Sequence, residues 1–328
     1  MTETHSPSPL RVGLIGAGAI AQIAQLPALA GMEGVTIAGV VTASPESTAR
    51  NVQRWPIERG YASAEEMIDG ADLDAVFVLT RKHDHLPYVR MGLDAGLDVF
   101  CEKPLATSLA DAREMVDLAD AAPGLVMVGF NRRYAEVYRT AHEQYGAARP
   151  DLLVAQKNRR GSEYRATLEN GIHMVDLMRW FGGEAVEVTA TSHGDDPYRE
   201  DGTAALIRFD SGTTGIFVAA RSAGEWDERL ELYGGLRTVR VIAPDSVTVI
   251  EDGVSSTQEV RPRAAGWADI TTTGGFGPAV DHFLSCVRTR RTPLTNALEA
   301  YRSQELMDRI LAAAGLPTED SEDLGDGR

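Results

Sequence analysis

A pair of opposite charges stands at the end of an apolar run in the middle of the chain. Residues 98–106 read DVFCEKPLA, so Glu102 and Lys103 follow a segment suited to a buried strand and precede Pro104. Proline restricts the residue before it to extended backbone, which would hold Lys103 in a defined direction. The carboxyl end of a buried parallel strand is where such sheets bind ligands, although the pair could also simply cap the strand and face water.

A second set of polar side chains falls within residues 171–181, GIHMVDLMRWF. On a helix, His173, Asp176 and Trp180 lie at positions i, i+3 and i+7 and share one face, while the apolar residues can face the core. We therefore expect these polar groups to converge on a side away from packing. A lone histidine near a helix start is often only a surface or capping residue, so the pattern leaves both readings open.

A glycine pattern follows the first apolar run of the chain. It has the form G-x-G-x-x-A, in which Gly16 permits a tight turn, Gly18 lets the backbone approach a pyrophosphate, and Ala21 allows close packing of helix on strand. Ala19 and Ile20 open the helix, whose N-terminus favours an anion. Because the pattern lies between a strand and a helix, it predicts dinucleotide binding.

The second apolar run ends where a Rossmann domain contacts the adenosine ribose. Thr42 stands at that place and Ser44 lies two residues further on, so no carboxylate accepts from a ribose 2'-OH or repels a 2'-phosphate. The absence favours NADP(H) over NAD(H). An arginine partner for the phosphate is missing as well, so both cofactors stay open.

The elements that must position these residues alternate along the first part of the chain. Short apolar runs and helix-like segments follow one another between residues 11 and 122, with Gly or Pro at the helix ends. This alternation predicts parallel strands joined by crossover helices. We expect residues 9–124 to form a Rossmann dinucleotide-binding domain with a doubly wound parallel sheet.

The pattern changes further along the chain, where closely spaced strands with tight turns begin after about residue 151. Together with helices at 171–181, 280–288 and 297–314, they predict an α/β domain over residues 125–316 with a large, open, mostly antiparallel sheet. An open sheet exposes one face, which commonly becomes a subunit interface, so we expect a homodimer or homotetramer. Residues 317–328 form an acidic tail that we expect to be disordered.

Composition excludes several classes of protein. The 328 residues carry 32 Lys and Arg against 48 Asp and Glu, and a net charge of −16 disfavours nucleic-acid binding. No apolar run approaches the roughly 20 residues that cross a bilayer. The first ten residues have no signal-peptide pattern, so we expect a cytoplasmic protein. Cys101 and Cys286 stand far apart, which suggests neither a disulfide nor a metal site.

Four motifs, in their order and spacing, resemble one family over nearly the whole chain. Residues 16–21, 79–85, 99–106 and 171–180 are similar to the glucose-fructose oxidoreductase, inositol dehydrogenase and rhizopine-catabolism (Gfo/Idh/MocA) family, and residues 276–294 extend the resemblance. The resemblance implies a Rossmann domain, a C-terminal α/β domain with an open sheet, and NAD(P). It also implies hydride transfer with a sugar, polyol or related carbonyl compound.

The resemblance also implies residue roles. Lys103 matches the lysine that stabilises charge on the reacting oxygen, and His173 matches the histidine that exchanges a proton with that hydroxyl. Glu102 would position the lysine or contact the nicotinamide ribose. Glu169 stands where many members carry an aspartate that completes the catalytic set. Its role could persist, pass to Asp176 or be lost.

The loop after the third strand departs from the family pattern. Many members have Thr-Pro where this chain has Thr80 and Arg81, and the arginine could reach a cofactor phosphate or narrow the pocket. His85 matches the family's histidine in this loop, with a structural role. We expect all three residues beside the cofactor.

Basic residues suggest a class of substrate. Asn131 and Arg132 follow the next strand, and Arg132 or Arg133 could pair bidentately with a carboxylate or phosphate. With Lys157 and Asp176, they are the expected substrate-binding residues, and the cluster of cations favours an anionic sugar or sugar acid.

Two other functions compete with a dehydrogenase. The first is a catalytically silent protein that senses NAD(P) or a sugar. The second is a redox-neutral glycosidase or lyase in which bound cofactor is reduced and reoxidised within each turnover. Lys103 and His173 speak against the first, whereas Glu169 leaves it open.

Overall fold

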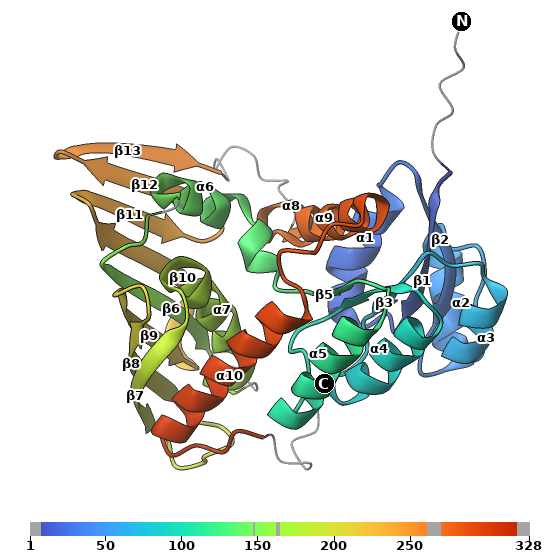
Figure 1. The fold of residues 1–328 in the computed structure, drawn as a ribbon, viewed down its shortest axis with the longest axis horizontal. Helices are drawn as coiled ribbons and strands as arrows, with labels where there is room; N and C mark the ends of the chain where they lie inside the picture. Colours follow the sequence, from blue (N-terminus) through green and yellow to red (C-terminus); the bar gives the residue numbers. More distant parts are fainter. Residues whose placement is uncertain (1–7, 147, 162–164, 261–269, 320–328) are drawn as a thin grey trace, which may run out of the picture. The chain divides into compact units, whose positions relative to one another are not determined.

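The fold consists of two compact units along the chain. A computed structural model describes residues 8–146, 148–161, 165–260 and 270–319 (Figure 1). The first unit comprises the described residues up to Gly129 together with Ile270–Thr272 and Phe276–Tyr301. The second comprises the described part of Phe130–Asp269, Thr273–Gly275, and the described residues from Arg302 onwards.

The first unit is built on a parallel sheet with the strand order β2-β1-β3-β4-β5. The strands are nearly continuous apolar runs, as expected for a sheet covered on both faces. Because the order reverses between β1 and β3, the carboxyl ends of these two strands form the switch point at which such sheets bind ligands. The strands are β1 (Leu10–Ile15), β2 (Val35–Val41), β3 (Ala75–Val78), β4 (Asp98–Cys101) and β5 (Val126–Val128).

Helices of the first unit begin where the sequence provides caps. Ser44, Ser63 and Ser108 each accept a hydrogen bond from the backbone N–H three residues on, which fixes the starts of α2, α3 and α5. A π-helical turn, Ala21–Gln25, precedes α1. The helices are α1 (Leu26–Ala30), α2 (Pro45–Arg54), α3 (Ala64–Gly70), α4 (His85–Asp94), α5 (Leu109–Ala121), α9 (Phe276–Thr289) and α8 (Ile270–Thr273), of which Thr273 belongs to the second unit.

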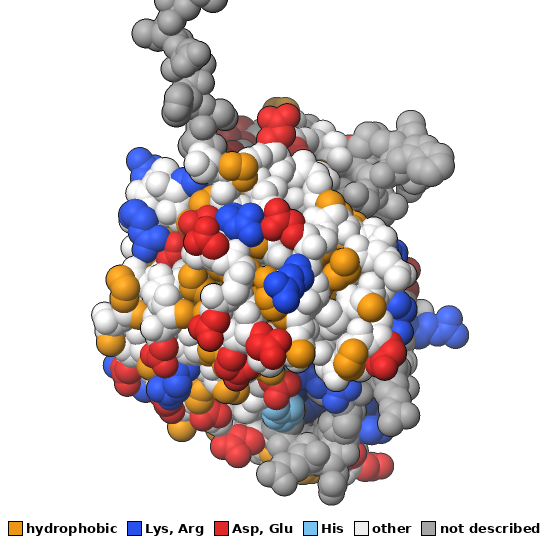
Figure 2. Space-filling view, turned by 90° about the vertical axis from the view of Figure 1, so that its right-hand side faces the viewer, with side chains coloured by type: hydrophobic (Ala, Val, Ile, Leu, Met, Phe, Trp, Pro, Cys, Tyr) orange, Lys and Arg blue, Asp and Glu red, His pale blue; other side chains and the backbone are white. Residues whose placement is uncertain are grey.

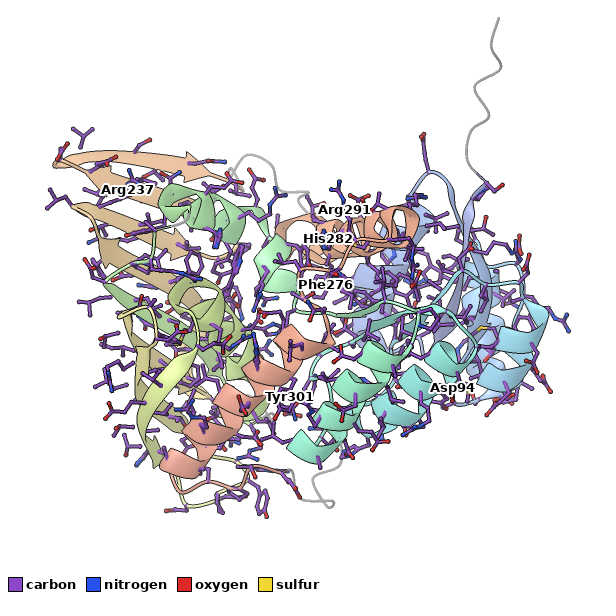
Figure 3. All side chains as sticks on the ribbon, in the orientation of Figure 1. Asp94, Arg237, Phe276, His282, Arg291 and Tyr301 are labelled. Atoms are coloured by element: carbon purple, nitrogen blue, oxygen red, sulfur yellow. The ribbon has the colours of Figure 1, made fainter. Side chains whose placement is uncertain are left out.

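An aromatic cluster joins α9 to the first unit although it is far away in the sequence. Phe283 packs edge-on against Phe77 and Phe100, with ring centroids 5.4 and 5.7 Å away. Figure 1 shows α9, coloured red, beside α1, coloured blue. His282 of the same helix (Figure 3) accepts a hydrogen bond from the N–H of Leu294 at 3.1 Å. This helix therefore belongs to the first unit.

The second unit is built on an eight-stranded sheet with the order β13-β12-β11-β10-β6-β9-β8-β7. All neighbouring strands are antiparallel except β6 and β9, which run parallel. Helix α6 (Glu136–Tyr145) packs on β11 and β12, and α7 (Ile172–Gly182) packs on β6 and β9. The strands are β6 (Leu152–Arg160), β7 (Ala185–His193), β8 (Gly202–Phe209), β9 (Thr214–Ala220), β10 (Ser222–Gly234), β11 (Arg237–Ile242), β12 (Ser246–Glu251) and β13 (Val254–Glu259).

One face of this sheet is open to solvent within the described residues. Along β8 the burial alternates strictly, so Leu206 points outwards and is 54% exposed. Its partner Ile216 on β9 is 43% exposed, and Ile216 in turn lies opposite Val154 on β6. These three side chains form an apolar row across three strands. We call them the outer row.

The expected fold class is confirmed, with differences in detail. Helix α3 and strand β13 were not predicted, and β10 begins seven residues before the expected strand at 229–233. Helix α10 (Ala297–Ala313) has its first five residues in the first unit and the rest in the second. The expected domain ranges divide at 124/125, whereas the compact units divide at Gly129 and the first unit takes in Phe276–Tyr301. Of the expected tail, residues 320–328 lie outside the described residues.

Two surface features bear on the classes of partner. Acidic and basic side chains are interspersed on the face of the first unit that Figure 2 shows. Among the helices of the described segments, none is both long enough and apolar enough to cross a membrane.

Candidate functional site

The turn after β1 requires glycine at its first position. Gly16 has φ +92°, and a Cβ added there would lie 2.7 Å from the carbonyl oxygen of Leu79 and 2.9 Å from the N–H nitrogen of Thr80. Its own N–H donates to the carbonyl of Val41 at 2.8 Å. The turn therefore packs closely against the residues at the ends of β2 and β3.

The rest of this turn is open and polar, which fits a dinucleotide pyrophosphate. A Cβ on Gly18 would meet no atom within 4 Å, and Ala19 and Ile20 are exposed in the first helical turn, where backbone N–H groups lack intrahelical partners. Next to Gly16, the buried Thr80 Oγ1 has no hydrogen-bond partner among the described residues. Free donors, an orphaned hydroxyl and open space together meet the needs of a bound phosphate pair.

A cavity of about 520 Å³ lies beyond the end of β2, where an adenosine moiety would extend. The predicted residues Thr42 and Ser44 line it, but their hydroxyls also hold the start of α2. Thr42 Oγ1 donates to the Ser44 carbonyl at 3.1 Å, and Ser44 Oγ accepts from the Ser47 N–H at 3.2 Å. The lining residues are Thr42, Ala43, Ser44, Pro45, Thr48, Ala49, Val52, Gln53, Gly60, Tyr61 and Ala62.

A carboxylate at the start of α2 escaped the sequence reasoning. Glu46 lies in the first turn of the helix, and its pKa is lowered by its own backbone N–H and by the hydroxyl of Ser44. The position expected to contact the ribose is the strand end itself, at Thr42, where no acidic residue stands. The available signal was a glutamate in the first helical turn, directly after a capping serine and a proline.

The Lys103 turn lies at the carboxyl end of β4, and the Lys103–Pro104 peptide is cis. Glu102 turns back on it, because its Oε2 accepts a hydrogen bond from the Lys103 backbone N–H at 3.1 Å. Its Oε1 accepts from the Nε2 of Gln25, in the π-helical turn before α1. Burial raises the pKa of Glu102 to about 7, against the opposing effect of the Lys103 charge. A carboxyl group that titrates near neutrality thus adjoins the candidate catalytic lysine.

His85 links two loops of the first unit through its buried imidazole, which agrees with the structural role that the family resemblance implies. We expected it among the cofactor-binding residues, but its side chain is 1% exposed. Nδ1 lies 2.9 Å from the carbonyl oxygen of Pro104, and Nε2 lies 3.4 Å from that of Thr80. Burial lowers its pKa, so the neutral imidazole prevails near neutral pH. It ties the loop after β3, where Arg81 is exposed, to the Lys103 turn.

In the second unit, a π-helical turn, Ala166–Gly171, leads into α7 and carries two predicted residues. A Cβ on Gly171 would lie 2.6 Å from the Phe217 ring, so glycine allows the turn to approach the sheet closely. Glu169 is half-buried and accepts a hydrogen bond from the Arg165 N–H at 3.2 Å. His173, 7% exposed, lies one turn further on. The structure thus brings Glu169 and His173 to the start of α7.

The expectation that Asp176 faces away from packing is wrong. Its side chain is 1% exposed and forms a bidentate ion pair with Arg133, at 2.7 and 2.9 Å, while Ser303 donates to Oδ1 at 2.9 Å. Trp180 is not a free polar group either, because it stacks on His142 with the ring centroids 3.9 Å apart. Helix α7 is buried on nearly every side, so its polar face serves packing.

Arg132 and Lys157, expected to bind the substrate, both pair with Glu228. Arg132 contacts the carboxylate at 2.8 and 3.0 Å, Lys157 Nζ lies 2.8 Å away, and Tyr138 donates to it at 2.7 Å. The exposures of Lys157 and the Glu228 side chain are 1% and 0%. Asn131, also expected to bind substrate, is 1% exposed and donates to a backbone carbonyl at 2.6 Å. The bidentate arginine was predicted correctly, but its carboxylate belongs to this chain.

Two important residues were missed although the sequence contained signals for them. Gln25 is a polar residue within the otherwise apolar core-facing side of the first helix. Glu228 lies two and four residues before Leu230 and Leu232 on β10, so the period of two along a strand already placed it on the same buried face as these leucines.

Comparisons with known proteins agree with this geometry. Residues 10–130 match the model of an oxidoreductase family with an NAD-binding Rossmann fold, and residues 137–240 match the GFO/IDH/MocA C-terminal domain. A putative oxidoreductase YceM of Salmonella typhimurium is 30% identical over 320 residues, 92% of this chain and 97% of that protein.

Two further relatives are more distant. A D-apiose dehydrogenase of Paraburkholderia graminis is 26% identical over 307 residues, 86% of this chain and 82% of that protein. A solved oxidoreductase from Agrobacterium radiobacter, in complex with NAD⁺, L-tartaric acid and magnesium, superposes with a TM-score of 0.84. It is 21% identical and the match covers 94% of this chain and 97% of that one, which shows a shared fold.

Proposed function

Because the chain belongs to the Gfo/Idh/MocA oxidoreductase family, we propose that it is an NAD(P)-dependent dehydrogenase or reductase. It transfers a hydride between the nicotinamide and a hydroxyl or carbonyl carbon of a sugar-like substrate. One observation carries this proposal: the open Gly18 turn and the Lys103 turn both lie at the carboxyl end of one parallel sheet.

Each catalytic residue has a role that its chemistry allows. The Lys103 ammonium stabilises negative charge on the reacting oxygen, and His173 exchanges the proton of the substrate hydroxyl. Glu169, at the start of the same helical segment as His173, keeps a carboxylate for orienting that imidazole. The hydride chemistry itself is supplied by the nicotinamide ring when the cofactor is bound.

The substrate that the second unit favours is neutral. We expected an anionic sugar because of Arg132 and Lys157, but both cations are paired with the buried Glu228. A neutral polyol or sugar needs no such cation, and one relative is named for the sugar D-apiose. We therefore rank neutral polyols and sugars before sugar acids.

For the cofactor, Glu46 reverses the preference drawn from the sequence. Its carboxylate already accepts the Ser44 hydroxyl and a backbone N–H at the start of α2. A 2'-phosphate would compete for the same donors and be repelled by the carboxylate, whereas a ribose 2'-OH could donate to it. We therefore propose NAD(H). Equal or tighter binding of NADPH than of NADH to the purified protein would exclude this preference.

The outer row is proposed as a contact with a second copy of the chain. Leu206, Ile216 and Val154 present apolar surface on a sheet face that no described element covers. A twofold axis through this face would bury the same residues from both copies.

A screen of neutral polyols, sugars, aldonates and uronates with both cofactors tests the function. We expect a net change in the reduced-nicotinamide absorbance band with at least one substrate. Product without a net change in absorbance would indicate the redox-neutral lyase or glycosidase. The absence of both product and absorbance change would indicate a sensor. Lys103→Met is expected to abolish turnover while leaving the Kd for NADH nearly unchanged, and retained turnover would exclude the role of the lysine.

A further inference from the structure

We propose that Gln25 is a positioning residue that holds the Glu102 carboxyl group and, through it, the backbone from which Lys103 extends. This inference rests on the proposed function, in which Lys103 acts on the reacting oxygen. All three residues belong to the first unit.

The Glu102 carboxyl group bridges two segments that are far apart in the sequence. Gln25 Nε2 donates to Oε1 from 77 residues away, and the Lys103 backbone N–H donates to Oε2 at 3.1 Å. With both oxygens engaged, the glutamate side chain has one arrangement, and the peptide that leads into Lys103 is held by it. The direction of the lysine is thereby fixed by a group outside its own loop.

Gly129, directly after β5, provides the space for this carboxyl group. A Cβ added to Gly129 would lie 3.2 Å from the Cδ and from both oxygens of Glu102, which is closer than ordinary contact. The carboxyl group therefore lies between the Gln25 amide and a bare backbone. A residue with a side chain at position 129 would crowd the Glu102 carboxyl group, so glycine favours this arrangement.

The position of Gln25 is costly for stability. The residue is 0% exposed, and its Oε1 has no partner among the described residues. A buried polar atom without a partner opposes folding, so methionine at this position would suit the core better. The π-helical turn Ala21–Gln25 that places the amide is a feature that frequently occurs at functional sites. The presence of the Gln25 amide in the core is therefore explained by the hydrogen bond that it donates to Glu102.

The orphaned oxygen has a use once Glu102 takes up a proton. The charged and titratable groups of the first unit that act on Glu102 are Lys103, from the same turn, and the buried thiol of Cys101. Burial outweighs the attraction of Lys103 and raises the pKa of Glu102 to about 7. The amide of Gln25 can donate to the carboxylate, and after a flip its oxygen can accept from the protonated form. One glutamine thus serves both forms.

A titration of the cofactor-free protein tests this without any substrate. Lysines are reductively methylated with ¹³C, and the Lys103 signal is identified by its loss in Lys103→Arg. We expect the wild-type signal to show an inflection near pH 7 that disappears in Glu102→Gln. In Gln25→Met the inflection should move upward by about one unit, because the charge-assisted hydrogen bond that the carboxylate loses is stronger than the neutral one that the protonated form loses.

The matched control is Gln22→Met, one turn earlier in the same helix. The Gln22 side chain forms hydrogen bonds with the Ala17 carbonyl at 3.2 Å, Asn51 at 2.6 Å and Trp55 at 3.0 Å, and Glu102 is not one of these partners. We expect this variant to lower stability and leave the inflection in place. Gln25→Asn, whose amide is too short to reach Glu102, provides a second variant and should behave like Gln25→Met.

Turnover separates a positioning role from a structural one. With a substrate from the screen, Gln25→Met should lower kcat about 10- to 100-fold, the size of effect expected for a misplaced catalytic group, while its thermal stability is no lower than that of the wild type. A Gln25→Met protein that loses stability like Gln22→Met and keeps the inflection would overturn the inference. If the inflection depends on Gln25 but no substrate turns over, the proposed function fails and the positioning of Lys103 stands.

Discussion

The two glycines of the turn after β1 offer a sharp test of cofactor binding. Gly16 has φ +92° and no space for a Cβ, whereas Gly18 is not among the residues with positive φ and has no atom within 4 Å of an added Cβ. The same substitution, glycine to alanine, should therefore have different effects at these two positions. Gly16→Ala should act on folding, and Gly18→Ala should act on ligand binding.

The magnitudes follow from the contacts. At Gly16 a left-handed conformation costs a residue with a side chain roughly 1–2 kcal/mol, and forcing a Cβ onto backbone atoms costs roughly 1–3 kcal/mol. The free energy of unfolding should thus fall by about 2–5 kcal/mol. At Gly18 the alanine should raise it by up to about 1 kcal/mol, because the unfolded chain loses freedom.

Urea denaturation measures the free energy of unfolding of both variants, and a fluorescence titration with NADH measures their Kd for the cofactor. If Gly18 lets the pyrophosphate approach the backbone, an added methyl group makes the free energy of NADH binding less favourable by roughly 1–3 kcal/mol. The Kd then rises about 5- to 140-fold. A Gly18→Ala protein that is more stable and binds NADH as well as wild type would refute the assignment of the cradle. If Gly18→Ala lost as much stability as Gly16→Ala, the open space around Gly18 would be refuted.

Four further predictions follow from the charged and apolar groups. Glu228→Gln should lower the free energy of unfolding by about 3–5 kcal/mol at pH 7, since it leaves two buried cations without their carboxylate. The pKa of Glu228 is lowered in the fold by Arg132 and Lys157, so this deficit should be constant above its ordinary pKa of 4.5 and shrink below it, as urea denaturation against pH would show. Glu46→Gln should narrow the ratio of the Kd values for NADPH and NADH, and an unchanged ratio would show that Glu46 does not discriminate. Leu206→Glu should reduce the mass seen by light scattering to that of one chain, and an intact oligomer would exclude the outer row as the contact.

The fold of the first unit could be predicted because its signals are local. Each strand of this unit is a short apolar run, and the serines that cap α2 and α5 mark the starts of these helices in the sequence. Strand β13 was missed for the opposite reason. Its six residues are all exposed and mostly polar, so neither hydrophobicity nor a period of two marks it, and only pairing with β12 makes it a strand.

Membership of the units depends on contacts that no local pattern contains. Helix α9 was expected in the second domain because it follows that domain in sequence. Phe283 instead packs against Phe77 and Phe100 across about 200 residues, and this side-chain cluster assigns the helix to the first unit. A single sequence shows that Phe283 is apolar but not which core it enters.

The same limit explains which site residues were predicted and which were not. The motifs around Gly16 and Lys103 are each contiguous in the chain, so their spacing alone indicated where they lie, whereas the contacts of Gly16 with Leu79 and of Glu102 with Gln25 are long-range and were not predicted. Arg132 finds its partner Glu228 96 residues away, and Arg133 finds Asp176 43 residues away. A count of charges therefore gave the right residue types for a cation cluster but assigned their counterions to a substrate.

Burial distinguishes the lysine that serves the structure from the one proposed for chemistry. Lys157 is 1% exposed and its counterion Glu228 is fully buried, so that moving either charge would leave the other without compensation. Glu102, beside Lys103, instead gives one oxygen to the backbone N–H of the lysine and the other to Gln25. Its carboxyl group thus engages the backbone from which the Lys103 side chain extends. A catalytic lysine requires such an arrangement, because it must meet an oxygen whose negative charge exists only during the reaction.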